Sequence, residues 1–518
     1  MKRGKKNSDA GDPVINSDPR TGSSELDSWM KPSLSSMKSM GLLLAVLMVA
    51  SVMFSLSVVL RDPPSDDVVE TDAASRVLQL RFHQAMESGG GLSEKKDRFG
   101  DNLVLGFDKE SCLSRYEASL YRKESPFKQS SYLDSRLKSY QDLHRRCGPF
   151  TGSYNSTLDI LKSGDGSDGG TSGCSYVIWL NSDGGELGNR MLSLASAFLY
   201  ALLTNRVLLV EPAAEMADLF CEPFPNTSWF LPSEFPLHEQ TLLRDSGNAT
   251  FAYRHLVRES HEQQKLFFCE ESQVLLNETP WLIMKADSFF APSLFSISSF
   301  EKELEKLFPE RETVFYFLGQ HLFHPTNVVW GLITRYYRAY LARADQRIGI
   351  HIGVTDTGND HQFQQLVEQI LACGIRHELL PEVEKQRHLP SSQVLNRKSK
   401  AVFISSSSPG YFESIRDVYW ENPTVTGEII SVHKPSHKEY QKTQRNMEGR
   451  RAWTEIYLLS CSDVLVVTTP WSSLVDVAHG LGGLKPWVLN GSDHDPYCMR
   501  ARSMEPCAQT PWSHGCKD

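Results

Sequence analysis

The stretch Tyr176-Val177-Ile178-Trp179-Leu180 is a run of five apolar residues, and its length is typical of a strand buried on both faces. A turn follows, and residues 191–203 then carry apolar side chains at helical spacing. A second strand-like run, Arg206-Val207-Leu208-Leu209-Val210, comes next. This order predicts a βαβ unit, in which the two strands lie parallel in one sheet.

The same alternation recurs in the second half of the chain. Alternating units of this kind build a mostly parallel sheet that helices cover on both faces. We therefore predict an α/β protein with two Rossmann-like lobes, at residues 108–340 and 341–518, that face each other across a cleft. The predicted strands of the second lobe are 348–354, 401–405, 428–432, 464–468 and 487–489, and its predicted helices are 363–372, 411–420, 451–460 and 473–481.

Composition narrows the class of protein. The chain has 518 residues, of which 40% are hydrophobic and 23% are charged, so it can bury a sizeable core and is not mainly disordered. Its formal net charge of -9 argues against a nucleic-acid-binding protein, which normally presents a basic surface. A mean hydropathy of -0.34 excludes a protein with many membrane spans.

One long apolar run covers residues 40–60 and contains no charged side chain. As a helix rising about 1.5 Å per residue, it is long enough to cross one bilayer. Basic residues precede the run and acidic residues follow it, which places the N-terminus in the cytosol. We predict a cytosolic tail at 1–39, a transmembrane signal anchor at 40–60 and a luminal stem at 61–107. A buried core helix is the alternative, and the length of the run disfavours it.

Cysteines and glycosylation motifs agree with a luminal body. All ten cysteines follow the apolar run and none forms a C-x-x-C pair, so disulfides in an oxidising compartment are favoured over a zinc site. The set of five N-x-S/T sequons points the same way. The sequons begin at Asn155, Asn226, Asn248, Asn277 and Asn490.

Four strand-to-helix junctions are candidates for ligand binding, because parallel sheets bind ligands at the carboxyl ends of their strands. They are residues 185–190, 351–356, 405–410 and 468–473. Each also has a purely structural explanation, as a glycine turn, a polar strand end, a serine-rich turn and a helix cap. Asp493-His494-Asp495 matches the D-x-D pattern of metal-dependent transferases, but its polar surroundings favour a surface loop, and we predict no metal site.

Several longer stretches of the sequence are specific enough to identify a family. Residues 131–149 read SYLDSRLKSYQDLHRRCGP, residues 192–210 read LSLASAFLYALLTNRVLLV, and residues 322–341 read LFHPTNVVWGLITRYYRAYL. Further such blocks lie at residues 110–116, 219–224, 423–430, 479–487 and 503–507. Together these stretches resemble the plant xyloglucan-type galactoside α-1,2-fucosyltransferases, and the resemblance covers nearly all of the chain from residue 108 to residue 516.

The resemblance implies a GT-B-like fold and a single-pass type II protein of the Golgi membrane with its catalytic body in the lumen. It implies transfer of L-fucose from GDP-fucose to the 2-hydroxyl of a galactose on a cell-wall glycan, xyloglucan or arabinogalactan, with inversion and without a metal. The expected partners are GDP-fucose, the polysaccharide acceptor, the Golgi membrane and copies of itself or of other Golgi transferases. No cofactor and no nucleic acid are expected.

The resemblance also implies roles for particular residues. Asn189 and Arg190 match the family's Gly-x-Gly-Asn-Arg segment at the cleft, and Asp287 matches an aspartate that contacts the acceptor. A structural carboxylate is the alternative for Asp287. The remaining expected nucleotide-sugar-binding residues are His351, Glu428, His433, Ser472 and Ser473.

Three departures from the family pattern bear on activity. The family strand reads Ile-Gly-Ile-Gln-Ile-Arg, and its arginine grips the GDP diphosphate, whereas here residues 348–353 read Ile-Gly-Ile-His-Ile-Gly, with Gly353 in the place of the arginine. Residues 185–188 read Gly-Glu-Leu-Gly instead of Gly-Leu-Gly. This sequence ends at Asp518, soon after Cys516, whereas relatives usually continue for some tens of residues with another cysteine.

These departures leave three hypotheses open. The chain is an active fucosyltransferase, in which Arg347, Lys400 or His351 takes over from the arginine. Alternatively, it is a catalytically silent relative that binds glycan or acts as a scaffold for other transferases, or an active enzyme that uses another GDP-sugar.

Overall fold

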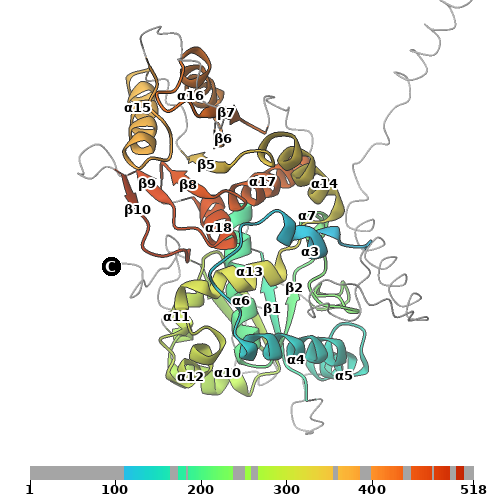
Figure 1. Ribbon diagram of the computed structural model, residues 1–518. Helices are drawn as coiled ribbons and strands as arrows, with labels where there is room; N and C mark the ends of the chain where they lie inside the picture. The colour runs from blue at the N-terminus through green and yellow to red at the C-terminus, as the bar shows by residue number, and fades with distance from the viewer. Residues whose placement is uncertain are drawn as a thin grey trace, which may run out of the picture. The chain divides into compact units, whose positions relative to one another are not determined.

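The apolar run at residues 176–180 forms a central strand of an all-parallel sheet of four strands, in the order β2-β1-β4-β3. The computed structural model describes residues 110–163, 173–181, 185–236, 251–257, 266–353, 360–384, 398–435, 445–469, 472–489 and 498–506 (Figure 1). They all belong to one compact unit, Thr71–Asp518. The strands of this first sheet are β1 (Tyr176–Leu180), β2 (Val207–Val210), β3 (Phe251–Leu256) and β4 (Trp281–Ala286).

The second sheet has six strands in the order β10-β9-β8-β5-β6-β7, and it is parallel except for β10. Each strand predicted in this half of the chain is confirmed to within two residues. The two parallel-sheet lobes of the prediction are therefore present. The strands are β5 (Gln346–Ile352), β6 (Ser399–Ser406), β7 (Ile429–His433), β8 (Val464–Val467), β9 (Trp487–Leu489) and β10 (Cys498–Arg500).

The helices fall into an N-terminal and a C-terminal group. Those of the N-terminal group are α3 (Leu113–Glu117), α4 (Ser131–Cys147), α5 (Gly152–Ser163), α6 (Leu187–Leu203), α7 (Ala214–Leu219), α10 (Glu270–Asn277), α11 (Ala291–Leu294), α12 (Ser298–Leu307), α13 (Val314–Leu322) and α14 (Asn327–Tyr336). Those of the C-terminal group are α15 (Asp360–Arg376), α16 (Pro409–Glu421), α17 (Arg445–Ser460) and α18 (Ser473–Gly482). Three short helical turns lie at Ala118–Leu120, Arg311–Thr313 and Tyr337–Leu341.

Alternation along the strands divides the buried side chains between two faces of each sheet. In β1, Val177 and Trp179 belong to a core on one face, while Tyr176 and Ile178 pack on the other face with Tyr154 of α5. In β5, Ile348, Ile350 and Ile352 belong to an outer core together with residues of α15 and α16. Both sheets are therefore covered on both faces, as the apolar runs predicted.

A layer of helices between the two sheets joins the lobes. Helices α6, α13, α14, α17 and α18 contribute to one continuous core, in which Phe198, Trp453 and Leu481 are fully buried. In Figure 1, α17 and α18 lie next to the strands of the second sheet, and α18 contacts α6 of the first lobe. Since this junction is apolar and continuous, it holds the two sheets in a fixed relation.

Disulfides confirm the expectation drawn from the cysteines. The structure pairs Cys112 with Cys221, Cys147 with Cys174, and Cys373 with Cys498. Such bonds restrict the unfolded chain and so stabilise the folded one. The sequon residues Asn155, Asn226 and Asn277 are exposed.

Several predicted features lie outside the described residues. They are the tail at 1–39, the apolar run at 40–60, the stem at 61–107, the sequons at Asn248 and Asn490, and the D-x-D pattern at 493–495. Within the part of the chain that the structure describes, no helix has the length and apolar composition needed to cross a bilayer.

Glu505 links the C-terminal segment to the first lobe. Its two carboxylate oxygens accept hydrogen bonds from the backbone N–H of Phe315, in the first turn of α13, at 3.0 and 3.2 Å. Glu505 is buried, so the carboxylate neutralises the positive end of α13 in a site shielded from water.

We expect Glu505→Ala to lower the free energy of unfolding by about 1–2 kcal/mol, because the first turn of α13 loses its capping acceptor. Urea unfolding followed by tryptophan fluorescence measures the change. The control is Glu368→Ala, at an exposed position of α15, which should unfold like the parent protein. Equal stability of the two variants would contradict the capping role.

Candidate functional site

The carboxyl ends of β1 and β4 bring two predicted elements of the site together. The strands are parallel neighbours with Leu180 opposite Lys285, so Asp287 and the turn between β1 and α6 lie at the same edge of the sheet. Asp287 follows the last residue of β4 and is half-buried. This edge is where parallel sheets bind ligands, so Asp287 lies at the ligand edge of the first sheet.

Helix α6 begins directly at this edge, and its first turn holds Asn189 and Arg190. The guanidinium of Arg190 donates to the backbone oxygen of Gly185 at 2.8 Å and to the carboxylate of Glu215 at 2.6 Å. These bonds fix the turn that precedes α6. The side-chain oxygen of Asn189 is buried and has no hydrogen-bond partner among the described residues.

The N-terminus of α18 lies against the N-terminus of α6. A Cβ atom at Gly188 would lie 2.4 Å from the carbonyl carbon of Ser473, so only glycine permits this approach. The hydroxyl of Ser473 donates to the carboxylate of Glu186 at 3.0 Å, and Ser472 is the N-cap of α18. Two helix N-termini thus converge, and such ends favour anions through their unpaired N–H groups and dipoles.

Gly353 lies at the carboxyl end of β5, in the second lobe. Its N–H donates to the hydroxyl of Thr468 at 3.2 Å, and it is exposed. A Cβ atom at this position would lie 2.5 Å from Oγ1 of Thr469 and 3.3 Å from Nε2 of His351. Any side chain at position 353 therefore requires Thr469 to rotate, and it would pass beside the tip of His351.

His351 is a polar residue on the inner face of the second sheet. Its Nδ1 lies 3.4 Å from the hydroxyl oxygen of Ser405, which donates to the carboxylate of Glu455 on α17 at 2.9 Å. The Nε2 atom is buried and has no hydrogen-bond partner among the described residues. Burial lowers the pKa of His351 to about 4, and burial raises the pKa of Glu455.

His433 and Glu428 lie at opposite ends of β7. His433 ends the strand, is half-buried, and has its ring 4.8 Å from that of Tyr340. Burial lowers its pKa. Because β7 lies two strands from β5 and the register sets His433 level with Gly349, His433 is about 10 Å from Gly349 and farther from the end of β5.

Glu428 and two proposed substitutes for the arginine lie at the amino ends of the strands. Glu428 precedes β7 and pairs with Lys400 at 3.4 Å. Arg347 is engaged by Asp463 at 3.0 Å. The structure therefore does not bring Glu428, Lys400 or Arg347 to the ligand edge, and of the basic candidates at the diphosphate only His351 lies there.

Two further charged residues approach this edge without a signal in the sequence. Glu455 stands in the middle of α17 between the buried residues Trp453 and Ile456, where a lone carboxylate looks like an ordinary helix charge. Lys434 follows β7, and Glu455 acts on its pKa from nearby. Only the crossing of α17 over the sheet, which no local pattern specifies, brings Glu455 to Ser405.

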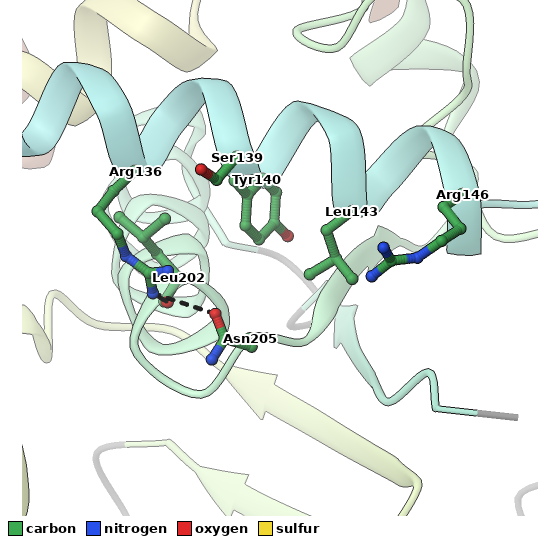
Figure 2. Close-up of a pocket in the computed structure, with 7 residues that line it drawn as sticks. All are labelled: Arg136, Ser139, Tyr140, Leu143, Arg146, Leu202 and Asn205. Atoms are coloured by element: carbon green, nitrogen blue, oxygen red, sulfur yellow. Dashed lines mark hydrogen bonds between the residues drawn. The ribbon is translucent and has the colours of Figure 1, made fainter. Parts of the chain in front are cut away.

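A small cavity of about 180 Å³ lies elsewhere, between α4 and the end of α6 (Figure 2). Arg136 crosses it and donates to the backbone oxygen of Leu202 at 2.8 Å and to the side-chain oxygen of Asn205 at 3.1 Å. Asn205 precedes β2, so the cavity lies at the amino edge of the first sheet, away from the candidate site. Its lining residues are Arg136, Ser139, Tyr140, Leu143, Arg146, Leu202 and Asn205. Among the residues with described positions, no three or more His, Cys, Asp or Glu side chains gather as a metal site would require.

Comparison with known proteins agrees with this layout. A family model described as "Xyloglucan fucosyltransferase" matches residues 73–250 and 243–517. Fucosyltransferase 3 of Arabidopsis thaliana is 78% identical, over 100% of both chains, and a galactoside 2-alpha-L-fucosyltransferase of Pisum sativum is 48% identical, over 93% of this chain and 88% of the other. A solved structure of an Arabidopsis thaliana FUT1 variant in complex with GDP is similar with a TM-score of 0.70 and 46% identity, covering 80% of this chain and 92% of that one.

We expect Gly188→Ala to destabilise the protein by about 1–3 kcal/mol, because the added methyl group forces α6 and α18 apart. The matched control is Gly331→Ala in α14, where a Cβ atom meets nothing within 4 Å. The control should be as stable as the parent or more stable, since alanine favours a helix by about 1 kcal/mol over glycine. Urea unfolding measures both, and an equal gain in the two variants would refute the close approach.

Proposed function

The chain belongs to the xyloglucan fucosyltransferase family, and on that premise we propose that it transfers L-fucose from GDP-fucose to the 2-hydroxyl of a galactose on a cell-wall glycan. The reaction inverts the anomeric carbon and needs no metal. The observation that supports the proposal most is the likeness to a GDP-bound FUT1 structure over 92% of that chain. The adjacent N-termini of α6 and α18, which favour anions, agree with it. The acceptor is xyloglucan or an arabinogalactan.

The donor side of the reaction needs positive charge. Fucose leaves through an oxocarbenium-like transition state while negative charge grows on the departing GDP. The N-termini of α6 and α18 present N–H groups and dipole charge at this point, and His351 offers an unpartnered nitrogen beside Gly353. Donors that are already in place stabilise the developing charge without reorganising.

The acceptor side needs orientation and a destination for the hydroxyl proton. Asp287 lies at the carboxyl edge of the first sheet, where we propose that the acceptor galactose meets the donor sugar. A half-buried carboxylate there accepts a hydrogen bond from the attacking hydroxyl and fixes its direction.

The cellular setting is part of the proposal. We propose a single-pass type II protein of the Golgi membrane, anchored by residues 40–60. The three disulfides and the exposed sequon residues Asn155, Asn226 and Asn277 support an oxidising lumen as the location of the body.

A second candidate function rests on Gly353 alone. Without an arginine at this position, the chain loses a permanent charge at the diphosphate, and a loss of this kind costs on the order of 10²–10³ in rate. The second candidate is therefore a catalytically silent relative that binds glycan or acts as a scaffold for other transferases.

Fucose transfer by the full chain to fucose-free xyloglucan separates the two candidates. We expect the parent protein to form a fucosylated product with GDP-fucose in the presence of EDTA. Gly353→Arg restores the missing charge, and Gly353→Ala controls for the added Cβ atom near Thr469. Activity in Gly353→Arg alone would establish the silent relative, and a folded parent and Gly353→Arg that are both inactive would refute the transferase.

We expect Asp287→Asn to lower kcat/KM for the acceptor by about 10²-fold and to leave GDP affinity unchanged, because the amide no longer accepts the proton of the attacking hydroxyl. Initial rates and GDP titration measure the two effects. Asp417→Asn, in α16 with a side chain that is 47% exposed, is the control and should behave like the parent. An equal loss of GDP affinity in Asp287→Asn would assign the residue a structural role.

A further inference from the structure

His351 stands where the strand pattern calls for an apolar residue. Residues 349, 351 and 353 of β5 and its end share the inner face, and Gly349 packs so closely there that a Cβ atom would meet Leu465 at 2.9 Å. Sheet register places Ser405 directly beside His351 on the same face. A buried imidazole on an apolar face needs partners at both nitrogens, and the chain supplies one of them, Ser405.

The hydrogen bonds fix which nitrogen is protonated. Ser405 donates its single proton to the carboxylate of Glu455, so its oxygen accepts from Nδ1–H of His351. In the neutral ring, Nε2 then carries a lone pair and no proton. A diphosphate oxygen cannot accept a hydrogen bond from that atom until the ring takes up a proton.

Nε2 lies beside the position of a missing side chain. It is 3.3 Å from the place that a Cβ atom at residue 353 would occupy, and Gly353 is exposed. Nε2 itself is buried, so we infer that a ligand approaches it over the bare backbone of Gly353. An arginine at position 353 would fill this approach and would repel a second cation beside it.

We propose that His351 replaces a fixed arginine by taking up one proton from solvent on Nε2 when the donor diphosphate binds, with Ser405 and Glu455 as its positioning residues. The inference rests on the proposed function and names how that site recognises GDP. In the bound state the imidazolium lies between two anions, donating Nδ1–H to Ser405, which donates to Glu455, and Nε2–H to a phosphate oxygen. The proton returns to solvent when GDP leaves.

Charged and titratable groups around this chain favour such a state. From α17, Glu455 faces Ser405, and Arg451 acts on Glu455. Burial raises the pKa of Glu455, and the hydrogen bond from Ser405 and the charges of Lys434, which follows β7, and Arg451 offset only part of that rise. Tyr336 of α14 also lies near Glu455, and burial raises the pKa of its hydroxyl, which stays neutral. On the side of β8, Thr468 and Thr469 offer uncharged hydroxyls.

The sign of the pH dependence follows from this arrangement. In the free protein the pKa of His351 is about 4, so the ring is neutral at pH 6 to 8. A diphosphate beside Nε2 favours the cation and raises the pKa in the complex. GDP affinity is then highest at low pH, falls by up to about tenfold per pH unit between the pKa of the free protein and the raised pKa of the complex, and levels off above the latter.

Calorimetric titration of the full chain with GDP tests the proposal. Binding heats measured at pH 7 in two buffers of different ionisation enthalpy give the number of protons taken up. We expect uptake approaching one proton in the parent and near zero in His351→Gln, whose GDP affinity should be weaker by about tenfold or more. Because a phosphate monoester itself titrates near pH ~6, the difference between the two proteins at the same pH is the quantity that counts.

Two further variants test the chain of hydrogen bonds. Gly353→Arg carries a permanent charge, so it should bind GDP with no proton uptake and with little change of affinity between pH 6.5 and 8. Glu455→Gln should bind GDP with reduced uptake, while Glu448→Gln, at an exposed position on the same helix, should match the parent.

The outcomes separate this inference from the proposed function. GDP binding with the same proton uptake in the parent, His351→Gln and Gly353→Arg would overturn the role of His351 and leave the transferase in place. Failure of every folded variant to bind GDP would overturn the proposed function and the inference with it. If His351→Gln does not fold, the proton uptake of Gly353→Arg compared with that of the parent tests the role of His351. Gly353→Arg leaves His351 in place, so this comparison does not depend on replacing it.

Discussion

The direct contact of α18 with α6 at Gly188 is the constraint on which the rest of the structure depends. It lets the inner helix layer share one continuous core, from Phe198 in α6 to Leu481 in α18. It also sets the N-termini of two helices from different lobes side by side at the ligand edge. A larger residue at position 188 would separate the two helices. It would also move apart the backbone N–H groups at their N-termini.

Much of the fold could be predicted from local sequence, and the reason is the burial of both sheets. The apolar run that forms β1 and the run of β9 match the observed strands residue for residue, because strands covered on both faces leave little doubt about their extent. The start of α6 was less visible, since its first turn contains Gly188, Asn189 and Arg190 in place of apolar residues and begins four residues before the predicted helix. Strand β3 has only an intermittent buried pattern, so no simple periodicity reveals it.

The location of a candidate site residue was predictable only where the direction of its strand alone decides which edge of the sheet the residue occupies. Asp287 and Arg190 follow parallel strands of one sheet, and their shared edge follows from that fact. Glu428 is equally close to a strand in sequence, but it precedes β7 and pairs with Lys400 at the opposite edge. Glu455 belongs to the site through the crossing of α17 over the second sheet, a tertiary arrangement that a helix of mixed polarity does not specify.

Under the proposal, Gly353 and His351 act together as one binding element for the diphosphate. A fixed guanidinium at the diphosphate keeps its charge whether or not the nucleotide is present. An imidazole that is neutral in the empty site and charged only beside an anion adds its charge during binding, and that contribution depends on pH. The glycine leaves no side chain beside Nε2, and Ser405 with Glu455 keeps the ring oriented. Loss of an arginine from the family pattern is thus compatible with recognition of a diphosphate, provided that a buried polar group beside it can still change its charge.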